Sequence, residues 1–464
     1  MRGNLHELLS QDSVAQKPPQ QTQINKLPQQ LITIPPHPTQ EKKNILLIFD
    51  YPFILRCTKL IKPLSHLVKW LLICTIIGIA VGSASAFFLV SLDWITHVRT
   101  SHTYLYWGLP FMGFVVGAIY HYFGQEVVKG NNQLIEELQE PNKVIPFKMM
   151  PLILLTTLLT HLVGGSAGRE GTAVQMGGAI ADQLKRPLRL TDMERKILLL
   201  AGISAGFSSV FGTPLAGTIF AMEVAIIGKM RYEAIFPCLI SALVSDLVCQ
   251  QVWHVGHTHY AIAFVPSLSV VSLAWALLAG ALFGLMGTTF AKITHFWNAL
   301  FKKHITYPPL RPVIGGVLLL LAFLLVHQEA YMGLGVPTIV ASFSEKLPWY
   351  DFLGKTFFTS LTLGSGFKGG EVTPLFYIGA TMGNMLSTFI DLPLALLAGM
   401  GFVAVFSGAS NTPLACTLMG IELFGSSAAV YLAIACITAY LCSGHVGIYA
   451  SQQIGVKKGE DGYK

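Results

Sequence analysis

Charge is scarce in this sequence. Only 12% of the 464 residues are Asp, Glu, Lys or Arg, whereas 52% are hydrophobic. A soluble domain usually carries about 25% charged residues, so the composition excludes an ordinary soluble fold. The sequence also lacks a complete Gly-rich phosphate-binding loop ending in Lys-Ser or Lys-Thr, which argues against ATP as the energy source.

Paired cysteines are missing as well. The seven cysteines are scattered, mostly through apolar segments, without the spacing of a disulfide framework or a metal site. We therefore expect buried free thiols, no metal ion and no cofactor. The histidine cluster formed by His254, His257 and His259 has a spacing that suits a metal ion poorly. An aromatic-rich interfacial loop is the simpler interpretation of that segment.

Long apolar stretches are abundant instead. A bilayer core requires roughly 20 helical residues, and four stretches are about that long. They are residues 67–92, 104–123, 235–252 and 270–290. Others, such as 353–363 and 412–424, are too short to span alone. Full-length and short apolar segments interrupted by Gly and Pro are typical of transporters and channels, because broken helices persist within a membrane only around a cavity or a site.

Basic residues gather beside three of the apolar stretches. The positive-inside tendency places these regions, together with the N-terminus, in the cytoplasm. The three groups are Lys59, Lys62 and Lys69; Lys185, Arg186, Arg189, Arg195 and Lys196; and Lys292, Lys302, Lys303 and Arg311. This topology accounts for the net charge of +7 without a nucleic-acid partner.

The composition divides the chain into three regions. Residues 1–45 are rich in Gln and Pro, and we expect them to form a disordered cytoplasmic tail. Residues 46–450 carry the apolar segments and form the transmembrane domain. Residues 451–464 form a short second cytoplasmic tail.

One pattern occurs twice within the apolar region. A Thr-Pro-Leu-Ala motif occupies 213–216 and again 412–415, and a glutamate follows each threonine by ten positions, at Glu223 and Glu422. A Gly-rich turn with an acidic residue precedes each copy by a similar distance. The pattern indicates two repeated halves, roughly 67–252 and 264–449, and such repeats place a site at their interface near the membrane midplane. A basic loop follows only the first turn, which favours inversion.

The first Gly-rich turn has the composition of an anion site. Gly168 and Gly171 allow backbone N–H groups to approach a ligand, and the apolar stretch after Thr172 indicates that the turn begins a helix. A carboxylate at Glu170 can occupy the place of an anion when ionised and leave it when protonated. The alternative is structural, with Glu170 pairing with Arg169 or capping the helix.

Two further segments offer matching groups. The second turn provides the Glu371 carboxylate and the Thr373 hydroxyl before a helix that begins at Pro374. The amide of Asn131 can donate to an anion, although paired asparagines before a helix are also ordinary caps. Glu223 and Glu422 are interpreted as structural, at helix ends that reach water. Asp246 lies within an apolar stretch and has no partner that the sequence identifies.

Residues 67–449 resemble the CLC family of chloride channels and anion/proton antiporters. Residues 168–172 resemble the GREGP motif of the family, with Thr172 in place of proline and Glu170 on the external gating glutamate. Residues 370–374 resemble the GxFxP motif, with Val372 in place of phenylalanine.

Three other positions follow from the same resemblance. Asn131 stands where chloride members carry the central serine of GSGIP, and Tyr449 falls on the anion-contacting tyrosine. Val224 falls on the internal proton-transfer glutamate of the exchangers, so that carboxylate is absent. Together these departures resemble one branch, the bacterial CLC-type fluoride/proton antiporters.

The resemblance implies a fold, a membrane location, a transport function and a set of site residues. It implies an all-α multi-pass membrane fold of two inverted repeats, with broken helices meeting at a central anion site. It also implies a homodimer in the plasma (inner) membrane of a prokaryote, exporting cytoplasmic fluoride in exchange for protons without a cofactor. Glu170 would gate the site and carry protons. The implied anion-binding residues are Asn131, Gly168, Arg169, Gly171, Thr172, Glu371, Val372, Thr373 and Tyr449.

The chemistry of fluoride agrees with the implied anion-binding residues. Fluoride is a small, tightly hydrated anion, and it requires good hydrogen-bond donors when it is dehydrated. A chloride/proton exchanger or chloride channel of the same fold is the nearest alternative, and Glu170 does not distinguish it. A sodium-coupled carrier for organic solutes would not require the GREG motif at a helix start. A membrane enzyme would require a nucleophile–base pair or metal ligands.

Overall fold

The computed structural model describes residues 51–459, with side chains from Ser65 onward. The expected tail 1–45 and the last five residues of the 451–464 tail therefore lie outside the described residues. The chain divides into a short unit, Met1–Lys59, and a long unit, Leu60–Lys464. All described residues except the first nine of the first helix belong to the long unit.

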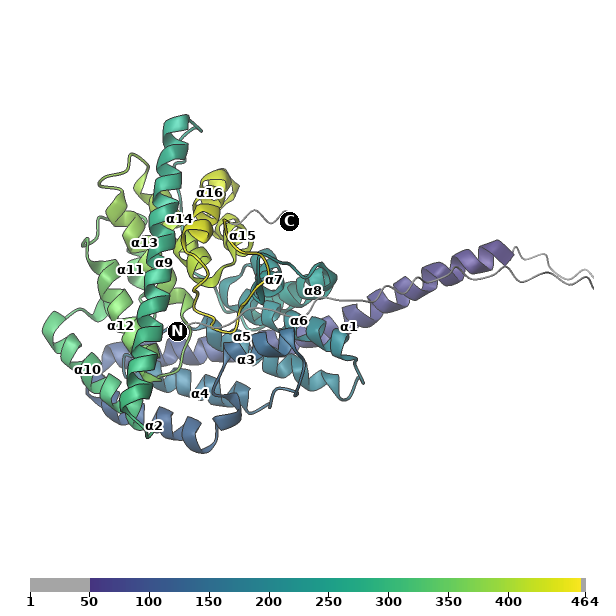
Figure 1. Cartoon of the computed structure of the whole chain (residues 1–464), viewed down its shortest axis with the longest axis horizontal. Coiled ribbons are helices and arrows are strands. Elements are labelled where there is room, and N and C mark those ends of the chain that lie inside the picture. The colour runs from purple at the N-terminus through teal and green to yellow at the C-terminus, as the bar shows by residue number, and fades with distance from the viewer. Residues whose placement is uncertain (1–50, 460–464) are drawn as a thin grey trace, which may run out of the picture. The chain divides into compact units, whose positions relative to one another are not determined.

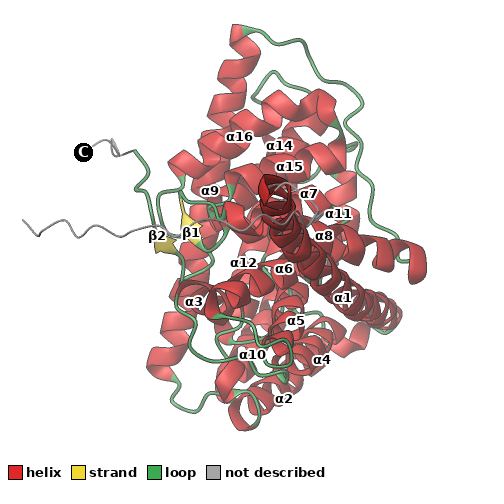
Figure 2. Cartoon of the chain, turned by 90° about the vertical axis from the view of Figure 1, so that its right-hand side faces the viewer, coloured by secondary structure: helices red, strands yellow, loops and turns green. Residues whose placement is uncertain are grey.

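The described part of the chain is almost entirely helical, with one short parallel pair of strands (Figure 2). The helices of the first half are α1 (Tyr51–Ser101), α2 (Leu109–Tyr122), α3 (Asn131–Gln139), α4 (Met149–Leu162), α5 (Glu170–Asp182), α6 (Asp192–Phe211), α7 (Pro214–Glu223) and α8 (Ile235–Leu247). Those of the second half are α9 (Val270–His304), α10 (Leu310–Val326), α11 (Val336–Ala341), α12 (Asp351–Ser365), α13 (Val372–Leu386), α14 (Leu394–Ser410), α15 (Pro413–Phe424) and α16 (Ala429–Cys442). The strands are β1 (Ile226–Ile227) and β2 (Gln453–Ile454). The predicted all-α class is confirmed.

The predicted mixture of long and short apolar helices is also present. Among the described residues, three helical segments are long and apolar enough to cross a bilayer: Ser65–Ser101, Tyr232–Val252 and Val270–His304. Several apolar helices are shorter, among them α4, α10, α14 and α15. The prediction of one span over 104–123 was wrong. A 3₁₀ turn (Thr103–Gly108) precedes α2 there, and Pro110 in the first turn of α2 begins a new helix.

Each half contains one very close helix crossing. In the first half α5 crosses α6, and a Cβ added to Gly177 would lie only 2.2 Å from the carbonyl oxygen of Gly202. In the second half α13 crosses α14, and a Cβ added to Gly379 would lie 2.0 Å from the carbonyl oxygen of Gly401. Only glycine permits backbones to approach so closely. The two crossings correspond in the repeat, so the same packing occurs twice.

The halves meet where α7 packs beside α15 (Figure 1). The carboxylate of Glu223, at the end of α7, accepts hydrogen bonds from the N–H groups of Leu414 and Ala415 at the start of α15, at 3.3 and 3.0 Å. Glu422, near the end of α15, accepts in return from the first turn of α7. Since each C-terminal glutamate caps the other helix, the two helices are antiparallel, as inverted repeats require.

These contacts change one expectation. Glu223 was expected at a helix end that reaches water, and that expectation was wrong, because its side chain is buried and bonded to α15. The structural interpretation of both glutamates still agrees with the contacts that they make.

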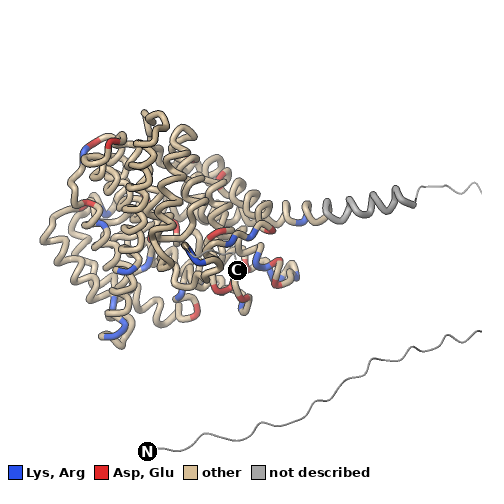
Figure 3. The backbone as a smooth tube through the Cα atoms, turned by 45° about the horizontal axis from the view of Figure 1, so that its top comes forward, with Lys and Arg blue, Asp and Glu red and all other residues tan. Residues whose placement is uncertain are grey.

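Acidic and basic residues lie mainly at the turns and helix ends, while most of the length of the helices carries no charged residue (Figure 3).

Arg195 differs from the expectation that it belongs to a basic loop. It lies in α6, is fully buried, and donates to Asp182 at 2.7 Å and to Glu137 at 2.8 Å. Sequence proximity to a loop could not reveal that its partners come from α5 and α3. The ion pairs fix these three helices to one another.

Candidate anion site

The two Gly-rich turns meet at the interface of the repeats. Gly168 and Gly370 form an antiparallel bridge, with N–H donors 2.6 and 2.8 Å from the opposite carbonyl oxygens. A Cβ added to Gly370 would lie 2.8 Å from the backbone nitrogen of Gly171, so glycine is required for this approach. The bridge brings the N-termini of α5 and α13 together. Their free N–H groups and positive dipole ends favour an anion at this point.

A carboxylate occupies this position. The side chain of Glu170 is fully buried, and its Oε2 accepts hydrogen bonds from the N–H of Thr373 at 3.0 Å and the N–H of Arg169 at 3.1 Å. Its Oε1 accepts a short hydrogen bond from the Thr373 hydroxyl. The donors around Glu170 are therefore those that a bound anion would use if the carboxylate moved away.

The alternative pairing of Glu170 with Arg169 receives only weak support. Nε of Arg169 lies 3.6 Å from Oε1 of Glu170, within ion-pair range, but it forms no hydrogen bond there. The side-chain donor that does bond the carboxylate comes from Thr373, in the opposite half of the fold. Arg169 contributes its backbone N–H instead.

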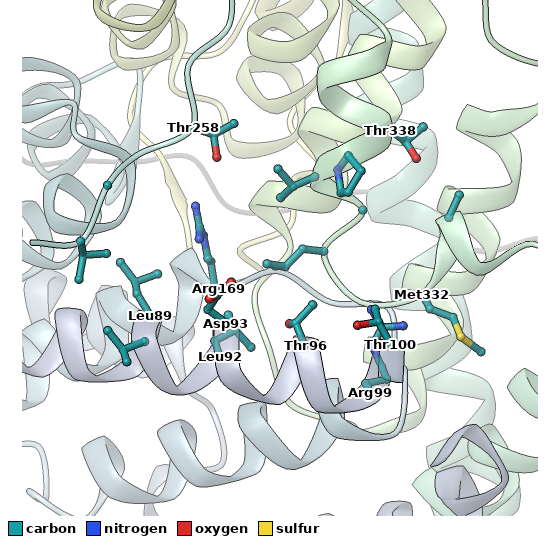
Figure 4. A pocket seen from close by; sticks show the side chains of 18 of the residues that line it. Leu89, Leu92, Asp93, Thr96, Arg99, Thr100, Arg169, Thr258, Met332 and Thr338 are labelled. Atoms are coloured by element: carbon teal, nitrogen blue, oxygen red, sulfur yellow. The ribbon is translucent and has the colours of Figure 1, made fainter. Parts of the chain in front are cut away.

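A large cavity opens beside Arg169, the residue that precedes Glu170. Its volume is about 880 Å³, and it is lined by α1, the loop at 253–258 and the segment 329–338. Arg169 reaches into it beside Asp93 of α1, and Thr258 and Thr338 face it from other elements (Figure 4). Both signs of charge line the cavity, because Arg99 and Glu329 also belong to its wall. Hydrated ions of either charge can approach Arg169 through such a space.

A second, much smaller cavity lies near the start of α3. Its volume is about 10 Å³, which is room for about one water-sized species. Its wall is almost entirely apolar and includes Val224, and Asn131 and Tyr449 are the lining residues whose side chains carry a polar group. Oδ1 of Asn131 is buried without a hydrogen-bond partner, so the amide is not engaged as an ordinary helix cap.

The first turn, α3 and the second turn converge near this smaller cavity. A Cβ added to Gly171 would lie 3.0 Å from Nδ2 of Asn131 and 3.9 Å from Oε2 of Glu371. The structure thus brings together Asn131, Gly171, Glu371 and, across the smaller cavity, Tyr449. A small anion between them would meet an amide and a phenol, both of which can donate hydrogen bonds.

Two residues of the expected set face elsewhere. The hydroxyl of Thr172 shares a hydrogen bond of 2.8 Å with the hydroxyl of Thr157 on α4, so it holds the start of α5 against a neighbouring helix. Val372 is buried in the main apolar core at the start of α13. Neither side chain donates to the Glu170 carboxylate.

Several neighbouring contacts escaped the sequence. Ser451 and Gln452 bond to helices around the smaller cavity, although no motif marks either residue. Asp246, whose partner the sequence did not identify, accepts a hydrogen bond from Nε2 of Gln250 at 2.8 Å, and Nε2 of His257 lies 3.3 Å from the same oxygen without forming a hydrogen bond. Within residues 65–459, no group of three or more His, Cys, Asp or Glu side chains could hold a metal ion.

The sequence matches a known family over most of its length. The model of the voltage gated chloride channel family matches residues 112–444. A protein of Pseudomonas syringae pv. tomato described as a chloride/fluoride channel protein is 51% identical over 401 residues, covering 85% of this chain and 88% of that protein.

Solved structures agree with this match. The crystal structure of a CLC-type fluoride/proton antiporter is 35% identical in sequence and superposes with a TM-score of 0.81, covering 84% of this chain and 99% of that one. A slow cyanobacterial Cl⁻/H⁺ antiporter is 19% identical, with a TM-score of 0.71, covering 82% of this chain and 96% of that one. The second likeness concerns the fold alone. The expected CLC fold of two inverted repeats is therefore confirmed.

Proposed function

Because the chain belongs to the voltage gated chloride channel family, whose members are integral membrane transporters of anions, we propose that it is a secondary active antiporter that exports cytoplasmic fluoride in exchange for protons. The observation that carries the proposal is the Glu170 carboxylate, held by donors from α5 and α13 at the interface of the repeats. The 35% identical fluoride/proton antiporter favours fluoride, and the description of the 51% identical relative includes both chloride and fluoride.

The donor set suits fluoride. Fluoride is small and strongly hydrated, so a site that dehydrates it must offer several hydrogen-bond donors at short range. The Thr373 hydroxyl and the N–H groups of α5 and α13 provide donors at the position of the Glu170 carboxylate. Asn131 and Tyr449 line the smaller cavity and would add donors if their polar groups turned toward a bound ion, and the volume of that cavity admits only a water-sized species.

The exchange cycle depends on one carboxylate with two states. Ionised Glu170 occupies the anion position, and its protonation weakens the hold of the surrounding donors and admits fluoride in its place. The protonated side chain then carries its proton inward while fluoride moves outward. Val224 makes the wall of the smaller cavity apolar where other exchangers carry a glutamate, so Glu170 serves both sides of the membrane.

Glu371 belongs to the same site. Its carboxylate lies close to Gly171 and Asn131, where a protonated carboxyl would add a donor and an ionised one would repel fluoride. Glu371 is therefore a second carboxylate whose protonation state would change how strongly the site holds fluoride, while Glu170 remains the residue that carries the proton.

The membrane placement follows the basic residues. We propose that the protein lies in the plasma membrane of a prokaryote, with its N-terminus in the cytoplasm, and that it forms a homodimer. A tag at the N-terminus should be accessible to protease only from the cytoplasmic side. Crosslinking in membranes should trap pairs of chains.

Transport by the purified protein in liposomes tests the proposal. Fluoride efflux should be accompanied by proton uptake, and chloride efflux under the same conditions should be much slower. A Glu170→Gln protein should no longer exchange protons for fluoride, and Glu345→Gln, on a segment away from the site, serves as the control. Chloride moving as fast as fluoride would instead identify a chloride exchanger or channel of the same fold. Proton-coupled fluoride exchange by Glu170→Gln would refute the assigned cycle.

A further inference from the structure

The residues that follow Tyr449 are bonded to α3, the helix that begins at the smaller cavity. We call residues 450–458 the C-terminal strap. The N–H of Ser451 donates to Oδ1 of Asn132 at 3.0 Å, and the Ser451 hydroxyl donates to Oε1 of Glu136 at 3.0 Å. Nε2 of Gln139 donates to the carbonyl oxygen of Ser451 at 2.8 Å. The strap is therefore fixed along α3, the helix that begins with Asn131.

The next residue joins the two halves of the fold. Nε2 of Gln452 donates at 2.8 Å to the carbonyl oxygen of Val224, just after α7, and at 2.8 Å to that of Ser410, at the end of α14. Its Oε1 accepts a hydrogen bond from Nδ2 of Asn411 at 3.1 Å. One amide side chain thus uses both of its donor hydrogens and an acceptor to bind helix ends that belong to opposite repeats.

The remainder of the strap is anchored as well. β2 pairs with β1, with Gln453 opposite Ile226. Nζ of Lys458 donates to Oδ1 of Asn411 at 2.6 Å and to the hydroxyl of Ser443 at 3.0 Å, and it lies 3.9 Å from the centre of the Tyr440 ring. Both ends of the strap are consequently held, and Tyr449 lies directly before it in the sequence.

We propose that the C-terminal strap is a clamp that fixes Tyr449 at the smaller cavity, which Asn131 also lines, and that Ser451 and Gln452 are positioning residues for fluoride selectivity. The inference depends on the proposed function, because it assigns the cavity to fluoride. The physical reason is the size of the cavity. Hydrogen-bond donors must lie at short range around so small an anion, and a displacement of about 1 Å in such a constellation has a large effect on function.

A loosened clamp should affect fluoride more than chloride. With Gln452 removed, the Tyr449 segment loses its attachment to Val224 and Ser410, and the cavity can widen. A wider cavity leaves fluoride with incomplete coordination, whereas a larger anion gains room. The clamp therefore predicts a higher KM for fluoride and a lower preference for fluoride over chloride, with a smaller effect on the maximal rate.

The test compares Gln452→Ala with a matched variant elsewhere. Asn384, which is fully buried where Gln452 is partly buried, also donates to two carbonyl oxygens, those of Ser342 at 2.9 Å and Glu345 at 2.6 Å, and accepts from the N–H of Leu347 at 3.1 Å. Asn384→Ala removes a similar set of bonds away from the smaller cavity. Both variants are reconstituted in liposomes, and the fluoride KM, the maximal rate, the fluoride-to-chloride rate ratio and the thermal stability are measured.

Gln452→Ala should raise the fluoride KM by about tenfold, the lower end of the range for outer-shell partners of a binding site, and reduce the rate ratio. Asn384→Ala should lower stability to a similar extent and leave the KM and the ratio unchanged. If Gln452→Ala only loses stability, as the control does, the clamp is structural and the inference is wrong. Ser451→Ala, which loses only the bond to Glu136, keeps the test decisive if Gln452→Ala does not fold, because it should shift the same two quantities less.

The wild-type protein separates this inference from the proposed function. If wild type moves chloride as readily as fluoride, the proposed function fails whatever the variants do. If wild type exchanges fluoride for protons and Gln452→Ala and Ser451→Ala keep its KM and its rate ratio, only the clamp fails.

Discussion

Glu170 on α5 accepts two hydrogen bonds from a single residue on α13, one from the N–H of Thr373 at 3.0 Å and one from its hydroxyl. The carboxylate and its donor belong to opposite repeats, and the bridge between Gly168 and Gly370 holds the two helix starts together. Protonation of Glu170 therefore weakens an interaction between the halves, as well as one within a helix. This relationship makes Thr373 a sensitive position.

Thr373→Val should impair exchange without changing the shape of the site. The substitution removes the hydroxyl donor and keeps a side chain of similar size. A hydrogen bond to a charged group contributes about 1.5–3 kcal/mol, so we expect the rate of fluoride/proton exchange to fall by about tenfold or more. Thr381→Val is the control, because the Thr381 hydroxyl on the same helix bonds only to carbonyl oxygens of its own helix. Equal rates in the two variants would contradict the role of the Thr373 hydroxyl.

Arg195→Met should destabilise the protein strongly. Arg195 is buried between Asp182 and Glu137, and removing one partner of a buried ion pair costs about 3–5 kcal/mol, since the remaining charges lose their compensation. Thermal unfolding in detergent measures the effect. Lys196→Met, which loses only a bond to the carbonyl oxygen of Gln139, should have a much smaller effect. A triple variant that replaces Arg195, Asp182 and Glu137 with apolar residues should recover only part of the loss, because the two carboxylates also accept from the N–H groups of Ile145 and Asn142.

Much of the architecture could be predicted, because Gly and Pro determine local geometry. Pro214 and Pro413 begin helices α7 and α15, and their recurrence with a glutamate near each helix end revealed the repeat. The Gly-rich turns at 164–172 and 364–374 indicated helix starts that approach one another. These signals lie within a few residues of each other, so the sequence alone displays them.

Other features depend on distant partners and left no local signal. The orientation of Thr172 is decided by Thr157 on α4, and the burial of Arg195 by acidic residues on two other helices. Gln452 lies in a short polar tail, and only the folded chain shows that its amide reaches Val224 and Ser410. An arginine near a loop or a glutamine in a tail has the same sequence signature whether it meets water or protein.

Lys458 in the C-terminal strap should make stability depend on alkaline pH. Burial lowers the pKa of Lys458 to about 8, whereas an unfolded lysine has a pKa of about 10.4. Between these values the unfolded chain binds more protons than the folded protein at this residue, so the free energy of unfolding rises with pH there. The penalty of burying the ammonium is present in full below pH about 8 and decreases as the pH rises towards 10.

The comparison with Lys458→Met isolates this effect. Thermal unfolding at a series of pH values from 7 to 10 should show the wild type gaining stability relative to the variant as the pH rises. Other groups titrate in both proteins and cancel in the difference. A difference that stays constant across this range would mean that Lys458 keeps its proton in the folded protein.

Glu223 and Glu422 provide a test of symmetry in the fold. Each carboxylate caps the helix that carries the other, so Glu223→Gln and Glu422→Gln should each lower the free energy of unfolding by about 0.3–1 kcal/mol, the range for a charge at a helix start. An amide oxygen still accepts a hydrogen bond but no longer offers a negative charge to the helix start. Because both residues act on the α7–α15 pair, their effects need not add, and a double variant measures the coupling between them.

The same two variants distinguish a cap from a proton carrier. Glu223 directly precedes Val224, in the wall of the smaller cavity, so its position alone would also suit a residue of the proton route. Its carboxylate is nevertheless engaged by two N–H groups of α15. We therefore expect Glu223→Gln and Glu422→Gln to keep the wild-type number of protons exchanged per fluoride ion. Fluoride flux and pH, followed together in liposomes, measure this number. A lower number in Glu223→Gln alone would show that the two glutamates are equivalent in the fold but differ in function.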